Sequence, residues 1–291
     1  MEVLVTGASG FVGGHVVPRL VAEGMTVRAL SRSPEGLPAG VTHVAGDVGD
    51  ATILRQAMRD ADAVVHLVAI IVERGDQTFF RVNHLGTESV VRTMREAGVR
   101  TLVHQSALGV GPGLQKYPYL HSKWLGEEAV RSSGLDYTIL RPGVIHGPGA
   151  GFFKPIVWNL RWLPVFPLPA GGTTRFQPVH VDDVCTAIVA SLRSPRNETA
   201  DVAGPEILTF AQLARIVMDA LGKPRPFLKI PLWMARPFAW SQRFRREPLV
   251  TSKQLDMVVL DNTTALDATI KAFGFEPKRM SEADLRWLSE L

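Results

Sequence analysis

The chain has 291 residues, of which 46% are hydrophobic and 21% are charged, and its formal net charge at pH 7 is +4. This composition is typical of a globular protein of one or two domains and excludes a disordered or fibrous chain. A nucleic-acid binder usually carries a basic stripe with interleaved aromatic residues, so the mild charge predicts no nucleic-acid partner. The longest apolar run, residues 64–72, is too short to cross a bilayer.

Cysteine usage indicates a reducing compartment. The single cysteine, Cys185, cannot form an intramolecular disulfide. No secretory signal is visible, because Met1 leads directly into Glu2 and a strand. We therefore expect a cytoplasmic protein without a transmembrane segment.

The first half of the sequence alternates β-type runs with helical periodicity. Strands are expected at residues 3–5, 26–30, 41–45, 63–68, 101–104 and 137–140, and helices at 10–22, 78–97 and 119–131. Apolar strands separated by helices predict a parallel sheet that is covered on both faces. The expected fold is therefore α/β, a Rossmann-type doubly wound sheet.

The pattern changes after residue 147. Prolines gather between Pro148 and Pro169, and two glycines follow, which predicts a loop-rich segment. Helices are expected at 181–192 and 209–221, and short helices after them. We expect a core of residues 1–147, to which residues 174–204 return, and a small, mainly helical C-terminal lobe within 148–291 that holds the substrate.

Three glycines follow the first strand in the stretch Thr6-Gly-Ala-Ser-Gly-Phe-Val-Gly13. In a strand–turn–helix context, the first glycine permits the turn, the second lets a pyrophosphate approach, and the third lets the helix lie close to the sheet. The alternative is a purely structural turn. The expected cofactor contacts in this loop are Gly7, Ser9, Gly10, Phe11, Val12 and Gly13.

The end of the second strand bears on the choice of cofactor. A site specific for NAD usually has an acidic residue here, but this strand ends Arg28-Ala-Leu-Ser-Arg-Ser33. Ser31 and Arg32 could instead hold a 2′-phosphate, which favours NADP(H) over NAD(H). The alternative is that Arg32 is only a solvated loop residue. Asp47 and Val48, after the third strand, are placed to border an adenine.

These motifs, with Tyr119-Leu-His-Ser-Lys123 and Arg141-Pro-Gly-Val-Ile-His-Gly-Pro148, resemble the short-chain dehydrogenase/reductase superfamily in its extended or atypical branch. The order of motifs through residue 220 is similar to the subgroup that contains the nucleotide-binding accessory subunit of mitochondrial complex I. The resemblance implies NAD(P)(H) bound across the carboxyl edge of the sheet. It leaves activity open, because that accessory subunit is regarded as a structural cofactor binder.

The resemblance also implies a catalytic set of Ser106, Tyr119 and Lys123. Tyr119 and Lys123 lie one helical turn apart, so they share a face. Tyr119 would move the proton, and a neighbouring ammonium and the oxidised nicotinamide would lower its pKa. Ser106 would hydrogen-bond the reacting oxygen. The alternative is a ribose-binding pair in a protein without turnover. The remaining expected cofactor contacts are Tyr119 and Lys123 themselves, Leu67, Val68, Ala69, Pro142, Val144 and Ile145.

Other polar residues have simpler interpretations. Asn83 is expected to be structural first and a proton relay second. His66, in the middle of a strand, is expected to be a hydrogen-bonded core histidine. No His, Cys, Asp and Glu residues have the spacing of a metal site.

Three functions remain open. The Ser-Tyr-Lys set favours an NADP(H)-dependent oxidoreductase, and the apolar, aromatic segment 152–169 suggests an apolar carbonyl or alcohol as its substrate. The alternative is a non-catalytic accessory or regulatory protein, and a weaker alternative is a sugar-nucleotide epimerase or dehydratase. A homodimer is a further possibility that the sequence leaves open. Residues 238–246 read as a solvated, Arg-flanked helix end, or else as a surface that touches a membrane or a protein partner.

Overall fold

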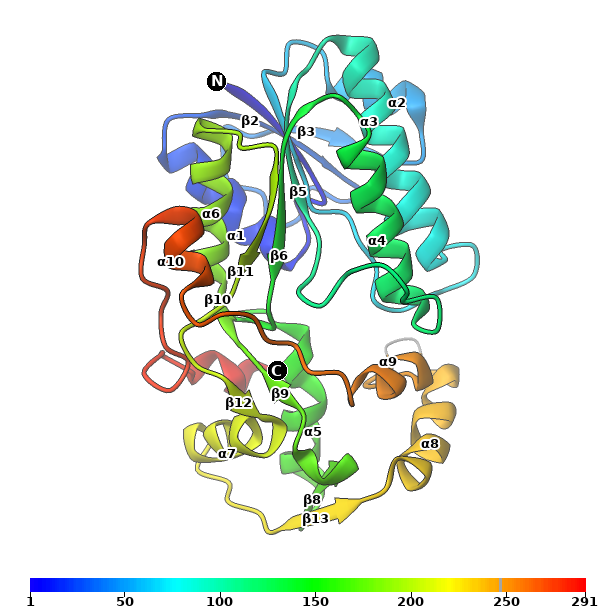
Figure 1. Ribbon diagram of the computed structural model, residues 1–291, viewed down its shortest axis with the longest axis vertical. Helices are drawn as coiled ribbons and strands as arrows, with labels where there is room; N and C mark the ends of the chain where they lie inside the picture. The colour runs from blue at the N-terminus through cyan, green and yellow to red at the C-terminus, as the bar shows by residue number, and fades with distance from the viewer. Residues whose placement is uncertain (246–247) are drawn as a thin grey trace. The chain divides into compact units, whose positions relative to one another are not determined.

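The computed structural model describes residues 1–245 and 248–291 (Figure 1). Internal contacts divide the chain into two units. The first unit comprises Met1–Pro142 and Val181–Val202, and the second comprises Gly143–His180 and Ala203–Leu291. The chain thus leaves the first unit at residue 142, five positions before the boundary expected from the sequence, and returns to it at 181 rather than 174.

The first unit is built on one seven-stranded sheet in the order β11-β6-β5-β4-β1-β2-β3, and all six pairings are parallel. The strands are β1 (Glu2–Thr6), β2 (Thr26–Ser31), β3 (Thr42–Ala45), β4 (Ala63–His66), β5 (Thr101–Gln105), β6 (Asp136–Pro142) and β11 (Glu198–Val202). The strand order reverses between β1 and β4, where doubly wound folds bind their ligands. The predicted Rossmann-type fold is confirmed.

Helices cover both faces of this sheet (Figure 1). On one face, α1 (Phe11–Ala22) packs against α6 (Val181–Arg193). On the other face lie α2 (Ala51–Ala57), α3 (Gly86–Ala97) and α4 (Pro118–Arg131). Every residue of β4 is buried, which explains why its sequence is apolar except for one histidine.

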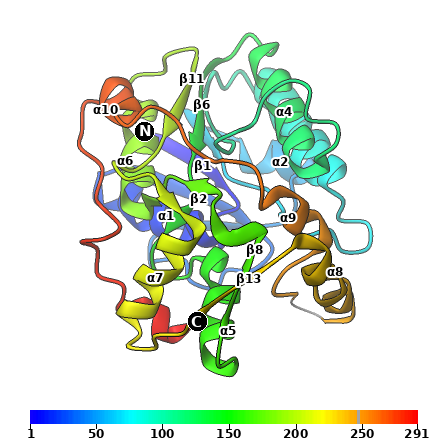
Figure 2. The same ribbon diagram turned by 60° about the horizontal axis from the view of Figure 1, so that its bottom comes forward.

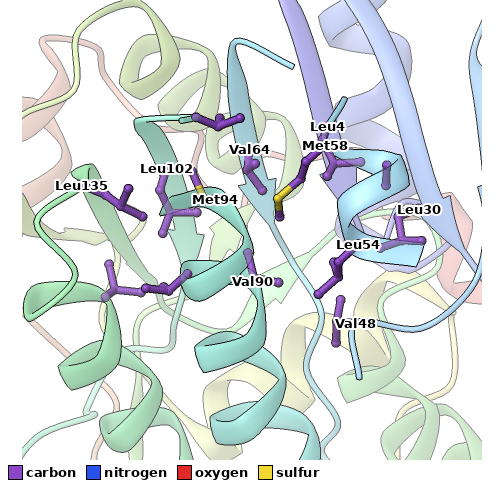
Figure 3. Packing of buried hydrophobic residues seen from close by; sticks show 14 of the residues in the cluster. Leu4, Leu30, Val48, Leu54, Met58, Val64, Val90, Met94, Leu102 and Leu135 are labelled. Carbon is purple, nitrogen blue, oxygen red and sulfur yellow. The ribbon is translucent and has the colours of Figure 1, made fainter. Parts of the chain in front are cut away.

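A hydrophobic cluster joins the sheet to α2 and α3 (Figure 3). Leu4, Val64 and Leu102 come from neighbouring strands, and Leu54 and Met94 come from the two helices. All five side chains are fully buried. The cluster holds these helices against the sheet through apolar burial, at about 25 cal/mol per Å².

The expected single helix at residues 78–97 is two elements. Phe80–Leu85 forms a π-helix, and α3 continues from Gly86. The wider π-turn contains Asn83, whose side chain bonds the loop after β4 and also Ser122 on α4. Such turns are frequent at functional sites.

The second unit is loop-rich but more helical at its start than expected. Residues 154–162 form a helix, α5 (Lys154–Trp162), within the segment predicted to be loop. That prediction was wrong because Pro155 lies in the first turn, where proline is tolerated. Ile156, Val157 and Leu160 are buried at helical spacing.

The other elements of the second unit are short. Three two-stranded pairings join β7 (Ile145–His146) to β10 (Val179–His180), β8 (Phe166–Pro169) to β13 (Phe227–Ile230), and β9 (Arg175–Phe176) to β12 (Leu208–Thr209). The helices are α7 (Phe210–Ala220), α8 (Leu232–Ser241), α9 (Ser252–Met257) and α10 (Ala268–Phe273), and α8 packs beside α9 (Figure 2). Thr209 caps α7 through a capping box with Gln212. Within residues 1–245 and 248–291, no helix has the length and apolarity needed to span a membrane.

Candidate functional site

The glycine loop connects β1 to the start of α1. Gly7 has φ +75°, in the left-handed region that favours glycine, and its N–H donates a hydrogen bond of 3.1 Å to the Leu30 carbonyl. A Cβ on Gly13 would lie 2.3 Å from the Gly7 oxygen, so a larger residue would force the helix away from the loop. Gly7 thus forms the expected turn, and the close approach at Gly13 is between the helix and the loop.

The N-terminus of α1 is open to an anion. Gly10 is the N-cap residue, no side chain caps the helix, and its first turn contains no acidic residue. The first backbone N–H groups of a helix have no partner within the helix and carry a partial positive charge. Ser9 and Gly10 are exposed, Phe11 is half-buried, and Val12 is buried. The loop thus presents mainly backbone to a ligand.

At the end of β2, the two residues that were expected to hold a 2′-phosphate have different surroundings. The Ser31 hydroxyl is buried, donates to the Ser33 carbonyl at 2.6 Å and lies 3.1 Å from His43 Nε2. Arg32 is exposed, and it has no hydrogen bond or ion pair with any residue that the structure describes. Arg32 is therefore the group that remains free to meet an anion.

After β3, Asp47 and Val48 point to different surroundings. Asp47 is exposed, and its Oδ1 accepts a hydrogen bond of 2.8 Å from the Gly49 N–H. Val48 is buried in the hydrophobic cluster, so its backbone rather than its side chain would face a ligand.

The loop after β4 lies directly against the glycine loop. Leu67 N–H donates to the Thr6 carbonyl at 3.1 Å, and a Cβ on Gly7 would lie 3.1 Å from the Val68 nitrogen. Ala69 is exposed at this edge. Asn83 then fixes the loop by bonding both the N–H and the carbonyl of Ile70. Asn83 thus has the structural role that was expected first.

Lys123 connects α4 to the end of β5. Its side chain is 1% exposed, and Nζ donates a hydrogen bond of 2.6 Å to the Gln105 carbonyl. Burial lowers the pKa of Lys123 to about 8, although the nearby Glu127 acts to raise it. The lysine therefore lies next to Ser106, the residue that follows Gln105.

Ser106 is buried and has an unused hydroxyl. Its backbone N–H donates to the Leu140 carbonyl at 2.7 Å, which fixes the residue at the end of the sheet. Its side chain is 4% exposed, and Oγ has no hydrogen-bond partner among the residues that the structure describes. A buried hydroxyl without a partner is unfavourable, which suggests a partner supplied by a ligand.

Tyr119 lies one turn before Lys123 on α4. The residue is half-buried, and its ring contacts the Phe79 ring edge-on at 5.7 Å. Burial raises the pKa of Tyr119 to about 12. Desolvation of the phenolate is the dominant effect in the protein alone, and the lowering expected from the ammonium together with a bound oxidised nicotinamide stays a prediction.

The residues expected beside the nicotinamide carboxamide divide between the two units. Pro142 ends β6 in the first unit, and its carbonyl accepts a hydrogen bond from the Leu108 N–H at 2.8 Å. Val144 and Ile145 belong to the second unit, where they pair with Val179. Their contact with a cofactor stays a prediction.

Two buried histidines lie on adjacent strands of the sheet, near Lys123. His66 is hydrogen-bonded on both ring nitrogens, to Thr6 Oγ1 at 2.7 Å and Thr87 Oγ1 at 3.0 Å, as expected of a core histidine. His104 stacks on His66 at 5.2 Å and has no partner for either nitrogen among the described residues. Burial lowers the pKa of His66 to about 3 and that of His104 well below its ordinary value.

The sequence reasoning missed a buried ion-pair network behind Lys123. Glu127 is fully buried and binds Arg131 at 2.5 Å and Arg141 at 2.6 Å. The available signal was its position one turn after Lys123 on the same helix face. In residues 1–245 and 248–291, no group of three His, Cys, Asp or Glu side chains could hold a metal ion.

The comparison with protein families decides what this loop, helix and sheet edge represent. Residues 7–154 match the model of the NAD(P)H-binding family, which covers the glycine loop, β5 and α4. The chain belongs to this family. It also matches the extended short-chain dehydrogenase/reductase branch that includes complex I alpha subcomplex subunit 9, which confirms the resemblance seen in the sequence.

Curated relatives of this family member carry different names. It is 30% identical to subunit 9 of the mitochondrial NADH dehydrogenase alpha subcomplex of Arabidopsis thaliana over 82% of this chain, and it spans 63% of that protein's length. It is 30% identical to a ceramide reductase of Caulobacter vibrioides, over 79% of this chain and 73% of that protein. It is 32% identical to sterol demethylase protein B of Methylococcus capsulatus, over 79% of this chain and 78% of that protein.

Solved structures show the same fold. The dTDP-glucose 4,6-dehydratase DesIV from Streptomyces venezuelae, solved with NAD and TYD bound, has a TM-score of 0.75 and 25% identity over 100% of this chain and 97% of its own. A UDP-glucose 4-epimerase from Thermotoga maritima has a TM-score of 0.74 and 21% identity over 99% of this chain and 98% of its own. The second likeness shows the fold alone.

Proposed function

We propose that this family member is an NADP(H)-dependent oxidoreductase that acts on a carbonyl or alcohol group of an apolar substrate. The observation that carries the proposal is the arrangement at the end of β5. The buried Lys123 amine bonds the Gln105 carbonyl, and the next residue holds a buried hydroxyl without a partner. A core selected only for stability would not leave both a buried lysine and an unused hydroxyl at one strand end.

The residues present fit a nicotinamide dinucleotide. The uncapped N-terminus of α1 suits the pyrophosphate, and the exposed Arg32 suits a 2′-phosphate. NAD(H) remains the alternative. The end of β2 lacks the acidic residue that usually selects NAD(H), but this lack alone does not exclude it. When bound, the nicotinamide supplies or accepts a hydride.

The chain's own residues then handle the proton. Tyr119 would donate its phenolic proton to the carbonyl oxygen as the carbonyl carbon is reduced, and Ser106 would hold that oxygen by a hydrogen bond. A Tyr119 pKa of about 12 keeps the phenol protonated at neutral pH, which is the form required for reduction. Lys123 would bind the nicotinamide ribose and place a positive charge near the phenol.

Two observations support an apolar substrate: the aromatic residues of the second unit and the names of two relatives. Residues 152–169 contain five aromatic residues, of which Phe152 and Trp162 are exposed. The names of two relatives, a ceramide reductase and a sterol demethylase protein, refer to lipids. A lipid-like carbonyl or alcohol is therefore the first substrate class to test.

The experiment combines a cofactor titration with one matched pair of variants. NADPH and NADH are titrated against the protein by nicotinamide fluorescence, and carbonyl lipids are then screened for NADPH oxidation. Tyr119→Phe is expected to lower turnover by about 100-fold or more and to leave NADPH affinity within a factor of two or three. Tyr117→Phe, two residues earlier at the N-cap of α4, is the control and should retain activity. Equal turnover in Tyr119→Phe and the wild type would refute the role of Tyr119.

A second candidate function is a non-catalytic NAD(P)H-binding accessory or regulatory protein. The observation in its favour is the similarity to the complex I subunit of Arabidopsis thaliana. In that case NADPH binds and no carbonyl substrate is reduced. Tyr119→Phe then changes only the affinity for NADPH. The sugar-nucleotide epimerase or dehydratase remains a weaker alternative, supported by likeness to solved structures of those enzymes.

A further inference from the structure

Helix α8 exposes apolar residues on nearly all of its surface. Its sequence is Leu-Trp-Met-Ala-Arg-Pro-Phe-Ala-Trp-Ser, and Ala239 is its only buried residue. Trp233 is 70% exposed and Trp240 is 54% exposed. Figure 2 shows the helix at the margin of the second unit, beside α9.

The short 3-10 helix Gln242–Phe244 extends the same surface. Phe244 is 72% exposed and contacts the Trp240 ring edge-on at 5.6 Å. We call α8 together with this turn the aromatic ridge, residues 232–244. A helix that is apolar all round is normally buried, and an exposed apolar patch normally marks an interaction site. The ridge contacts α9 and, through Phe238, the ring of Trp158, but Trp233, Trp240 and Phe244 stay exposed among the described residues.

The ridge also contains an arginine, Arg243, that stacks on its aromatic rings. The guanidinium of Arg243 lies 3.9 Å from the Trp240 ring centroid and 4.5 Å from that of Phe244. This stacking holds a positive charge directly on exposed aromatic faces. Arg236 on α8 is paired with Asp256 of α9 at 3.0 Å, so it contributes less net charge.

The sequence that leads into the ridge and through it is positive. Residues 220–246 include no Asp or Glu, and their basic residues are Lys223, Arg225, Lys229, Arg236, Arg243, Arg245 and Arg246. Arg246, the last residue of the surface expected at 238–246, lies outside the described residues. Each Lys or Arg near an anionic bilayer contributes about 1 kcal/mol of attraction. A protein surface would need a matching acidic patch, whereas an anionic bilayer supplies diffuse negative charge.

We propose that the aromatic ridge binds the surface of a bilayer that contains anionic lipids. Trp233, Trp240 and Phe244 would enter the headgroup region, and Arg243 would remain among the phosphates. Tryptophan and arginine have this preference at membrane interfaces. The helix has ten residues and is therefore about 15 Å long, so it lies on the membrane rather than crossing it. The proposal concerns binding only and does not depend on catalysis.

The test is co-sedimentation of the full chain with vesicles. Phosphatidylcholine vesicles are compared with vesicles of phosphatidylcholine and phosphatidylglycerol, at low and at high salt. The wild type is expected to pellet with the anionic vesicles, and high salt is expected to weaken this binding. Trp240→Ser/Phe244→Ser and Arg243→Glu should each lower the partition coefficient by about tenfold or more.

A matched control separates the ridge from general effects of charge and hydrophobicity. Phe80 is 52% exposed and Arg92 is exposed, and both lie in the first unit. Phe80→Ser and Arg92→Glu should bind vesicles as the wild type does. Circular dichroism and NADPH titration show whether each variant is folded, so loss of turnover and loss of membrane binding are measured separately.

Three outcomes would overturn the proposal. The first is no binding to anionic vesicles by the folded wild type. The second is an equal loss of binding in the ridge variants and the control variants. The third is a dimer, seen by analytical ultracentrifugation without lipid, that the ridge variants dissociate, because the ridge would then be the contact between two copies.

Discussion

Lys123 Nζ donates a hydrogen bond of 2.6 Å to the carbonyl oxygen of Gln105, so the amine of α4 is anchored to the end of the central strand β5. The side chain is 1% exposed. The contact joins the helix that carries Tyr119 to the strand that Ser106 follows. It also places a titratable group in the protein interior, where its ionisation affects stability.

Stability should rise with pH relative to a variant without this amine. The pKa of Lys123 is lowered from 10.5 to about 8 in the folded protein, so between these values the unfolded chain binds more protons. The free energy of unfolding of the wild type should therefore increase, relative to Lys123→Met, by about 1–2 kcal/mol between pH 8 and 9.5. Urea unfolding of both proteins at the two pH values measures this difference. Parallel pH profiles would contradict a lowered pKa.

Gly13 and Gly14 offer a matched pair on α1. An alanine Cβ at Gly13 would lie 2.3 Å from the Gly7 oxygen and 2.5 Å from the Ala8 oxygen, whereas at Gly14 nothing lies within 4 Å. Gly13→Ala should destabilise the protein by about 1–3 kcal/mol and weaken NADPH binding by about tenfold or more. Gly14→Ala should raise stability by about 0.5–1 kcal/mol, since the position is helical and open. Thermal unfolding and fluorescence titration check both variants, and equal effects would refute the close contact.

Arg32 should determine the preference between the two cofactors. A charge-assisted hydrogen bond to phosphate is worth about 1.5–3 kcal/mol, so Arg32→Ala should weaken NADPH by about 10- to 100-fold and NADH by much less. Arg92→Ala, which also removes an exposed positive charge from the first unit, is the control. Isothermal titration calorimetry with each nucleotide gives the ratio. Equal weakening of both nucleotides by Arg32→Ala would remove the argument for a 2′-phosphate.

His104 should make the protein sensitive to acid. Burial holds its pKa well below 6.5, so as the pH falls below 6.5 the unfolded chain takes up a proton that the folded protein does not. The wild type should lose stability on acidification, and His104→Leu should lose less. The difference should change by about 1–2 kcal/mol between pH 7 and pH 5 in favour of the variant. Denaturant unfolding at both pH values measures it, and no change in the difference would refute a buried neutral His104.

The sheet of the first unit could be predicted because its strands are apolar and are separated by helical patterns. Helix α5 could not be found in the same way, because Pro155 and the prolines around it are typical of loops. The π-helix has no separate signal in the sequence, since its extra residue per turn is stabilised by tertiary bonds of Asn83. Local patterns therefore predicted most strands and helices of the first unit. The π-helix depends on contacts between residues distant in sequence.

In the candidate site, too, some features could be predicted from local sequence and others depend on the packed structure. Gly7 and Gly13 could be recognised from their spacing, because it follows from the strand–turn–helix pattern, whereas Lys123 was singled out through the family resemblance. The direction of the Tyr119 pKa and the unpartnered nitrogens of His104 could not, because both follow from burial. The ion pairs of Glu127 required β6 to bring Arg141 beside α4. Electrostatics of a buried site depends on the packed structure.

The order in which the chain builds the first unit has a consequence for its biosynthesis. The edge strand β11 and helix α6 come from residues 181–202, after residues 143–180 have been contributed to the other unit. A nascent chain that has reached only residue 147 would expose the unpaired edge of β6 and the face of α1 that α6 covers. The nucleotide-binding half therefore completes its folding only after Val202 has left the ribosome, and until then it is open to aggregation or to chaperones.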